Sequence, residues 1–194
     1  MNPLEVQKKI IDNDLLIFTP LEFKRILNVP SKMAYNFLKY YTKKGLFIRL
    51  KNSVYCLAFR TPSEFHIANK LYQPSYISFE YALSYYHLIP ETVYTITSAT
   101  TKPTREFEAL NKVYRYYKIK KAVFLGYEPK KIEDVTIFIA EPEKALVDYL
   151  YFVDLKKKIL NERLVIKSLN KKKIIDYAEI FRRQSLMKLI KGLL

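Results

Sequence analysis

The sequence is poor in the residues that build metal, redox and nucleotide sites. It has one cysteine, Cys56, two histidines, His66 and His87, three glycines and no tryptophan in 194 residues. A single cysteine excludes an internal disulfide and fits a reducing compartment. No HExxH or paired CxxC spacing occurs, and three glycines cannot build a GxGxxG or Walker-type phosphate loop. The sequence therefore predicts no metal, no cofactor and no enzymatic active site.

Long apolar runs are also lacking. No run approaches the length of a membrane span, and the start, Met-Asn-Pro-Leu-Glu, lacks the charged and apolar regions of a signal peptide. These absences predict a cytoplasmic protein without a membrane partner. Apolar residues nevertheless make up 49% of the chain and aromatic residues 15%, which indicates a globular fold rather than a disordered chain.

Positive charge is abundant but segregated. The net charge is +15, and residues 1–60 carry 11 Lys or Arg against 4 Asp or Glu, whereas residues 61–150 carry 11 of each. Residues 151–194 carry 12 against 4. Two basic ends that flank a neutral middle indicate places where a polyanion binds. The alternative is a lysine-rich genome that supplies lysine wherever the surface tolerates it.

The first 60 residues predict three helices followed by a hairpin. The expected helices cover residues 3–13, 21–27 and 31–44, with Thr19 and Ser31 as N-caps of the last two and Gly45 ending the third. The β-type runs at 46–50 and 54–59 are separated by Lys51-Asn52-Ser53. This order is typical of a winged helix-turn-helix.

The remaining residues predict a mixed α+β domain. A helix capped by Ser78, short strands at 93–100, 105–110, 112–119, 122–127 and 135–140, and a helix that begins at Pro142 follow one another. The final 40 residues have a helical, basic pattern. The sequence thus predicts an α+β fold, with a winged helix-turn-helix domain at 1–60 and an α+β domain with a basic helical C-terminal end at 61–194.

The third predicted helix has two faces. Ala34, Phe37, Leu38 and Tyr41 recur at core spacing. Lysines neutralise phosphates and asparagine pairs with adenine, so the opposite face suits duplex DNA. With the outward residues of the hairpin, the predicted DNA-binding residues are Lys32, Tyr35, Asn36, Lys39, Lys43, Arg49 and Lys51. The alternatives are a solvated helix face, or a winged helix that serves as a scaffold for a protein partner rather than for DNA.

The basic C-terminal end offers a second candidate surface for DNA, RNA or a protein partner. Its residues are Lys171, Lys172, Lys173, Arg182 and Arg183. A solvated helix face is again the alternative.

Acidic residues near Lys144 do not form a nuclease motif. Nucleases of the restriction type place an acidic residue two positions before a lysine, and Pro142 stands there. Glu143 and Lys144 instead fit the first turn of a helix, where Lys144 is predicted to pair with Asp148 at i+4.

Three ordered blocks behind the predicted winged helix resemble the AbiEi family of antitoxins and transcriptional regulators. The first contains Tyr76-Ile77-Ser78, Ala82-Leu83 and Leu88-Ile89-Pro90. The second is the Thr-Ser-x-Thr-Thr run that begins at Thr97, followed by Arg105. The third is Ala140-x-Pro142-Glu143-Lys144-Ala145-Leu146-x-Asp148. The blocks cover about residues 61–153.

The resemblance implies an antitoxin that binds inverted repeats in double-stranded DNA of its own promoter and represses its own operon. It also implies that the following domain counteracts a nucleotidyltransferase-type toxin in a type IV system. The hairpin tip departs from the usual pattern, because Lys51-Asn52-Ser53 stands where a turn with glycine is more common.

Overall fold

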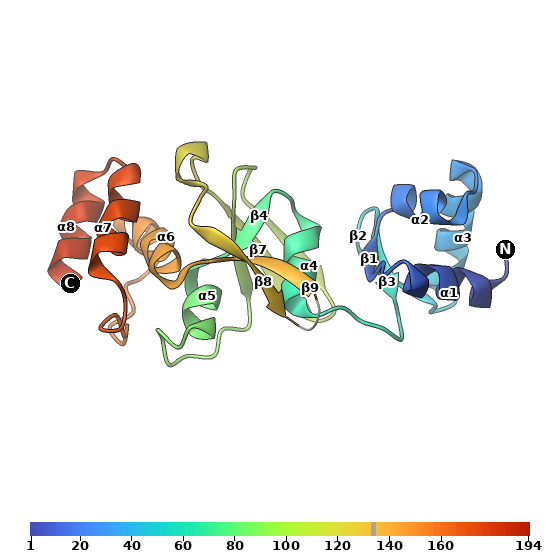
Figure 1. The fold of residues 1–194 in the computed structure, drawn as a ribbon, viewed down its shortest axis with the longest axis horizontal. Coiled ribbons are helices and arrows are strands. Elements are labelled where there is room, and N and C mark those ends of the chain that lie inside the picture. Colours follow the sequence, from blue (N-terminus) through green and yellow to red (C-terminus); the bar gives the residue numbers. More distant parts are fainter. Residues whose placement is uncertain (133–134) are drawn as a thin grey trace.

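The computed structural model describes residues 1–132 and 135–194, and these residues form a mixed α+β fold. Across the described residues there are eight α-helices, one short 3-10 helix and two β-sheets. The molecule is elongated, with the N terminus at one end and the last two helices at the other (Figure 1). No helix within the described ranges is long and apolar enough to cross a membrane.

Residues 1–60, which we call the N-terminal part, contain three helices and a small sheet. The elements are α1 (Pro3–Asp12), β1 (Ile17–Phe18), α2 (Pro20–Leu27), α3 (Ser31–Lys43), β2 (Phe47–Lys51) and β3 (Val54–Leu57). The three strands are antiparallel in the order β1-β3-β2. The hairpin is thus confirmed, but strand β1 was not predicted, because two residues are too few to show a strand pattern.

The predicted cap of α2 is confirmed and that of α3 is wrong. The Thr19 hydroxyl accepts a hydrogen bond from the Glu22 amide, and the Glu22 carboxylate accepts one from the Thr19 amide, which completes a capping box. In α3 the N-cap is Pro30, and the Ser31 hydroxyl instead accepts a hydrogen bond from Lys24. Gly45 follows α3 at φ +79°, as predicted.

The hairpin turns without glycine because Ser53 adopts a left-handed conformation, with φ of 61°. A bulge lies between Arg49 and Lys51, and it shifts the side-chain alternation. Phe47 and Leu50 are the buried residues of β2, whereas Ile48 is half-buried. The prediction that Leu46, Ile48 and Leu50 alternate inward, which accompanies the outward placement of Arg49, holds in part: Leu50 is buried, and Leu46 and Ile48 are half-buried against the apolar core, but the buried Phe47 breaks the alternation.

Residues 61–194, which we call the second part, are built around a mixed sheet. Its strands are β4 (Ser75–Ile77), β5 (Ile96–Thr100), β6 (Arg105–Ala109), β7 (Lys112–Lys118), β8 (Tyr127–Ile132) and β9 (Val135–Ala140). Their order is β6-β7-β5-β4-β9-β8, and the pairs β4–β9 and β5–β7 are parallel. The apolar run 122–127 is not the predicted strand: it holds the 3-10 helix Lys121–Val123 and reaches Tyr127, where β8 begins.

Helices lie on both sides of this sheet. They are α4 (Glu64–Leu71), α5 (Phe79–Tyr85), α6 (Pro142–Asp154), α7 (Lys171–Ile180) and α8 (Gln184–Leu193). Figure 1 shows α4 between the sheet and the N-terminal part, and α7 and α8 beyond α6 at the far end. The prediction that the final 40 residues are all helical is wrong for 155–170, which hold turns and irregular chain.

Two clusters of buried side chains form the interior. The smaller one draws on residues from Val6 to Leu57 and includes Phe18, Phe23 and Phe47. The larger one fills the second part, and it also takes in Ile17, Leu50, Val54 and Cys56 of the N-terminal part. The small sheet therefore presents apolar side chains to both clusters, and the two parts are in contact.

Candidate nucleic-acid interface

Helix α3 presents the predicted stripe to solvent. Lys32, Tyr35, Asn36, Lys39 and Lys43 are all exposed, and 57% of the Tyr35 surface is accessible. On the other face, Ala34, Phe37 and Leu38 are buried against the small cluster. The division of α3 into a core face and a solvent face follows its helical period, because residues three and four apart share one side.

A groove runs between α3 and the β2–β3 hairpin. It encloses about 520 Å³ and brings together four of the predicted DNA-binding residues, Tyr35, Lys39, Lys43 and Arg49. Its remaining lining residues are Thr42, Asn52, Ser53 and Tyr55. Arg49 donates a hydrogen bond to the Asn52 side chain, which holds its guanidinium at the tip of the hairpin.

The polar residues of this groove were only partly predicted from the sequence. Asn52 and Ser53 are polar residues at the hairpin tip, a place where a wing contacts a ligand, and that position could have pointed to them. Thr42 gave no signal. Its hydroxyl is buried and has no hydrogen-bond partner among the described residues. The groove thus has hydroxyl, amide and cationic groups along one opening, with no acidic side chain among its lining residues.

Lys32 and Asn36 lie beside a different hollow. They line it with Met33, Phe37 and Tyr40 near the start of α3, and its volume is about 610 Å³. Met33 and Tyr40 are about half exposed, with accessible fractions of 48% and 55%. The predicted stripe therefore separates two openings: a basic groove toward the hairpin and an apolar hollow on the other side of the helix.

Lys51 does not join the groove. It is half-buried, and its ammonium lies 5.0 Å from the centre of the Phe107 ring and 6.0 Å from that of Tyr72. The bulge after Arg49 accounts for this, because it breaks the alternation that would place both side chains on one face. The prediction that Lys51 points outward with Arg49 is corrected: Lys51 faces the second part.

The basic C-terminal residues differ in whether their charged groups are engaged in hydrogen bonds or ion pairs. Lys173 donates a 2.8 Å hydrogen bond to Glu141, Lys171 bonds to the backbone carbonyl of Leu194, and Arg183 pairs with Asp154 at 2.6 Å. Within the part of the chain that the structure describes, Lys172 and Arg182 have no such partner. Of the five residues predicted there, only these two present fully available charges.

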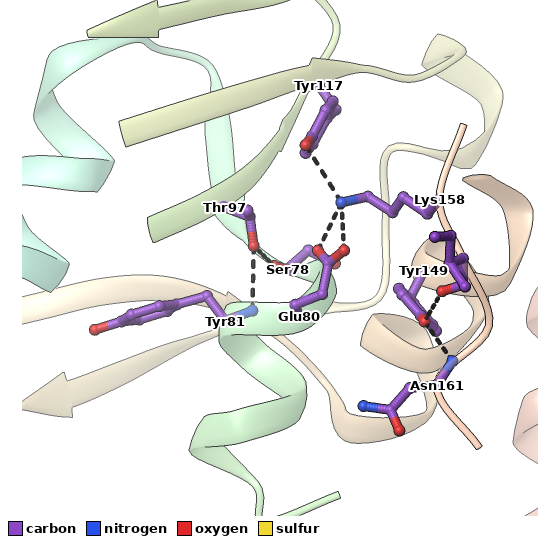
Figure 2. A network of polar contacts seen from close by, with 9 residues as sticks. Ser78, Glu80, Tyr81, Thr97, Tyr117, Tyr149, Lys158 and Asn161 are labelled. Carbon is purple, nitrogen blue, oxygen red and sulfur yellow. Dashed lines mark hydrogen bonds and ion pairs between the residues drawn. The ribbon is translucent and has the colours of Figure 1, made fainter. Parts of the chain in front are cut away.

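Lys158, in the basic run after α6, is likewise held inside the fold. Its ammonium hydrogen-bonds both carboxylate oxygens of Glu80 and the hydroxyl of Tyr117 (Figure 2). Figure 2 also shows Tyr149, whose hydroxyl accepts a hydrogen bond from the Asn161 amide at 2.9 Å. These contacts attach the irregular segment 155–170 to α5 and α6.

The centre of the second part holds a buried polar network. The Lys144 ammonium hydrogen-bonds the Asp148 carboxylate and, at 2.9 Å, the Tyr76 hydroxyl. The second Asp148 oxygen accepts hydrogen bonds from Tyr76 at 2.9 Å and from Ser78 at 2.8 Å. The predicted Lys144–Asp148 ion pair is thereby confirmed, but its complete burial was not foreseen. Ser78 occupies the predicted N-cap position of α5, but its hydroxyl makes no capping hydrogen bond and donates to Asp148 instead.

The ionisation of this network follows from its burial. Desolvation lowers the pKa of Lys144, and the Asp148 carboxylate acts in the opposite direction. Burial and the Asp148 charge raise the pKa of Tyr76 well above its usual value, so Tyr76 stays protonated and can donate to Asp148. With Lys144 at 1% exposure and Asp148 at 0%, no substrate reaches these groups. The arrangement positions strands and helix rather than reacting atoms.

The same network joins the sequence blocks that carry the family resemblance. Tyr76 and Ser78 come from the first block, and Lys144 and Asp148 from the third. Thr97, in the second block, donates a 2.7 Å hydrogen bond to the Ser78 carbonyl and accepts one from the Tyr81 amide (Figure 2). The three blocks therefore meet at one buried place.

Comparisons with known proteins add no assignment. A scan against protein-family models gives no match for this chain, and a search of curated proteins gives no significant match.

Proposed function

We propose that this protein is a DNA-binding antitoxin whose N-terminal part, residues 1–60, is a winged helix-turn-helix domain. The observation that carries the proposal is the groove in which Tyr35, Lys39, Lys43 and Arg49 converge from α3 and the hairpin. In a winged helix-turn-helix, the third helix and the wing are the elements that contact DNA. Here both elements contribute cations to one opening.

The chemistry of the groove suits a duplex. Lys39, Lys43 and Arg49 are positioned to neutralise phosphates and release counterions, while Tyr35 offers an aromatic ring and a hydroxyl. Asn36 lies on the same exposed stripe of α3 but lines the neighbouring hollow, and its amide can pair with adenine in the major groove. The partner is double-stranded promoter DNA, with inverted repeats expected from the resemblance to the AbiEi family.

The second part, residues 61–194, carries the antitoxin function in this proposal. Its support is the set of three sequence blocks that resemble AbiEi antitoxins and that meet at the Lys144–Asp148 network. The resemblance implies repression of its own operon and action against a nucleotidyltransferase-type toxin. Because the network is buried, the surface that opposes the toxin lies elsewhere, and the free charges of Lys172 and Arg182 on α7 and just beyond it are the candidates.

The DNA-binding proposal is tested by titrating the protein against a duplex of the DNA upstream of its own gene. Lys39→Glu should weaken binding about 5- to 10-fold and flatten the salt dependence, because it removes a phosphate contact and adds repulsion. Lys188→Glu on α8, exposed at the opposite end of the molecule, makes the same charge change and should leave affinity nearly unaltered. Equal effects of the two variants, or no binding by the unaltered protein, contradict the proposal.

The antitoxin function is tested by rescue of growth in cells that express a neighbouring nucleotidyltransferase-like gene. The unaltered protein should restore growth, and Lys172→Glu/Arg182→Glu should reduce rescue while leaving promoter binding intact. Lys188→Glu/Lys191→Glu, two exposed changes on α8, serves as the matched control. Failure of the unaltered protein to rescue contradicts the antitoxin role. Full rescue by the α7 variant removes only the surface assignment.

One observation favours a second candidate, a module that binds a protein rather than DNA. The hollow beside Lys32 and Asn36 is lined by exposed Met33 and Tyr40, which suit an apolar partner. In that case the upstream duplex would not bind, and Tyr40→Ser would abolish rescue from the toxin while Lys39→Glu would not.

A further inference from the structure

Three cations gather around one aromatic ring where the two parts of the molecule meet. The Lys102 ammonium lies 5.4 Å from the centre of the Tyr72 ring, and the Arg105 guanidinium and the Lys51 ammonium each lie 6.0 Å from it. Lys51 comes from β2 of the N-terminal part, whereas the others come from the turn before β6 and from its first residue. We call Lys51, Lys102, Arg105 and Tyr72 the junction cluster.

The ring at the centre of the junction cluster is fixed in place. The Tyr72 hydroxyl donates a 3.2 Å hydrogen bond to the Pro103 carbonyl, and its ring packs edge-on against Tyr116 at 5.3 Å. The turn that carries Lys102 is held as well, because its amide donates to Thr100, whose hydroxyl donates to the Pro74 carbonyl. The cluster is thus a pre-formed arrangement rather than three cations on a loose surface.

These three cations lack an acidic partner in the part of the chain that the structure describes. Within residues 1–132 and 135–194, no carboxylate forms an ion pair with Lys51, Lys102 or Arg105. The nearest acidic residue in sequence, Glu106, is already paired with Arg115 at 2.5 Å. Partial burial, followed by the charges of Lys102 and Arg105, lowers the pKa of Lys51, so holding these three cations together has an electrostatic cost. An anion bound among the three would relieve it.

The junction cluster lies next to the groove along the chain. Asn52 lines the groove, and Lys51 precedes it directly. Consecutive Cα atoms are about 3.8 Å apart, and one DNA strand carries a phosphate for about every 3.4 Å of helix axis. Along the chain the cluster therefore begins one residue from the groove, a step similar to the spacing of neighbouring phosphates, with the Lys51 side chain turned toward Tyr72.

We propose that the junction cluster binds a backbone phosphate of duplex DNA outside the stretch held by α3 and the hairpin, which makes the second part a DNA-contacting element. This inference rests on the proposed DNA binding by the groove. Lys51 and Lys102 neutralise the phosphodiester, and Arg105 donates hydrogen bonds to it in the forked geometry that guanidinium offers to phosphate. The contact positions the protein on the duplex and carries no base information.

The test uses the full chain and the upstream duplex in two lengths. The first length covers only the site protected by the groove, and the second extends it by about one helical turn, about 10 base pairs, on each side. The unaltered protein should bind the longer duplex about 10-fold more tightly, with a steeper salt dependence by about 0.9 for each added phosphate contact. Lys102→Gln/Arg105→Gln should lose this advantage and leave affinity for the short duplex unchanged. Both positions are exposed, so the fold is expected to persist.

Controls separate this inference from the one on which it depends. Lys188→Gln/Lys191→Gln on α8 removes two charges far from the junction cluster and should keep the full advantage of the longer duplex. An advantage retained by Lys102→Gln/Arg105→Gln overturns the junction site alone, provided that Lys39→Glu still weakens binding to both lengths. No binding of either duplex by the unaltered protein overturns the proposed function, and the junction site with it.

Discussion

The Lys144 ammonium and the Asp148 carboxylate lie one turn apart on α6 and are both withdrawn from water, with exposed fractions of 1% and 0%. Burial of two charges is tolerated because each has further partners: Tyr76 for Lys144, and Tyr76 with Ser78 for Asp148. The pair links α6 to β4 across the sheet. The pair therefore contributes to the fold by fixing α6 against β4.

Removing one partner of this pair should be far more harmful than removing both charges. We expect Asp148→Ala to lower the free energy of unfolding by about 3–5 kcal/mol, because it leaves a buried ammonium uncompensated. Lys144→Met/Asp148→Asn should lose less than Asp148→Ala, since no charge remains and the amide oxygen still accepts hydrogen bonds from Tyr76 and Ser78. Urea unfolding followed by circular dichroism measures both. Equal loss in the two variants would show that the charge itself is not what matters.

His66 should make stability depend on pH. Burial, with a smaller effect of Lys70 in the same direction, lowers the pKa of this imidazole from 6.5 to about 4, and its Nδ1 atom has no hydrogen-bond partner among the residues that the structure describes. The imidazole binds a proton more readily in the unfolded chain than in the folded one. The stability that comes from keeping His66 neutral is therefore fully present above about pH 6.5 and is lost as pH falls toward 4. We expect a loss of about 1–2 kcal/mol across that window, allowing for partial solvent contact.

The pH dependence is measured by urea unfolding at intervals between pH 7 and 4. The His66→Phe variant, which cannot titrate there, should show a shallower decline. Parallel curves for the two proteins would assign the decline to other groups, chiefly paired carboxylates.

Gly126 should not tolerate a side chain. Its φ is +72°, and an added Cβ would lie 2.7 Å from the Tyr177 ring, whose hydroxyl donates a 2.9 Å hydrogen bond to Glu141. Gly126→Ala is expected to cost about 1–3 kcal/mol through backbone strain and displacement of Tyr177. Gly192→Ala is the matched control, because that glycine is helical with open space around it, and alanine there should stabilise by up to about 1 kcal/mol. Similar melting shifts for both variants would rule out this explanation.

Cys56 should react slowly with thiol reagents in the folded protein. It is fully buried at the contact between the two core clusters, and burial raises the pKa of its thiol to about 11. Little thiolate exists at pH 8, and the reagent cannot reach it. Labelling with an aromatic disulfide should therefore be complete within minutes in denaturant and far slower without it. Rapid labelling of the folded chain would mean that the small sheet opens readily from the second part.

Local patterns in the sequence predicted most of the helices and strands, but they gave neither helix α4 nor strand β8. Thr19, Pro20 and Glu22 form a complete start signal within four positions, and the structure places α2 there. The apolar run 122–127 was wrongly predicted to be a strand. Its first residues belong to the 3-10 helix, and Gly126 follows in a left-handed conformation. Strands β1 and β4 are too short to show a period, and they exist because partners distant in sequence supply their hydrogen bonds.

The candidate site was predictable to the extent that it lies on one helix. Helical spacing was enough to place Lys39, Lys43 and Tyr35 on a single exposed face. The position of Lys51 was not predictable, because it depends on a bulge and on the rings of Tyr72 and Phe107. Nor does the sequence show that Lys158 forms an ion pair with Glu80, or Arg183 with Asp154. These acidic partners lie on helices that are separate from the basic residues.

The order of the strands also determines which part of the chain can fold first during synthesis. All buried members of the smaller cluster lie between Val6 and Leu57, so this cluster can form once that stretch has left the ribosome. The second sheet cannot close until β9 arrives, because Ile77 of β4 pairs with Ile139. Chains are made at about 5–20 residues per second, and pairings distant in sequence form late. For several seconds the basic groove of the nascent chain is therefore already formed. During that time Leu50, Val54 and Cys56 remain exposed to solvent, because the apolar residues of the second part that cover them have not yet folded.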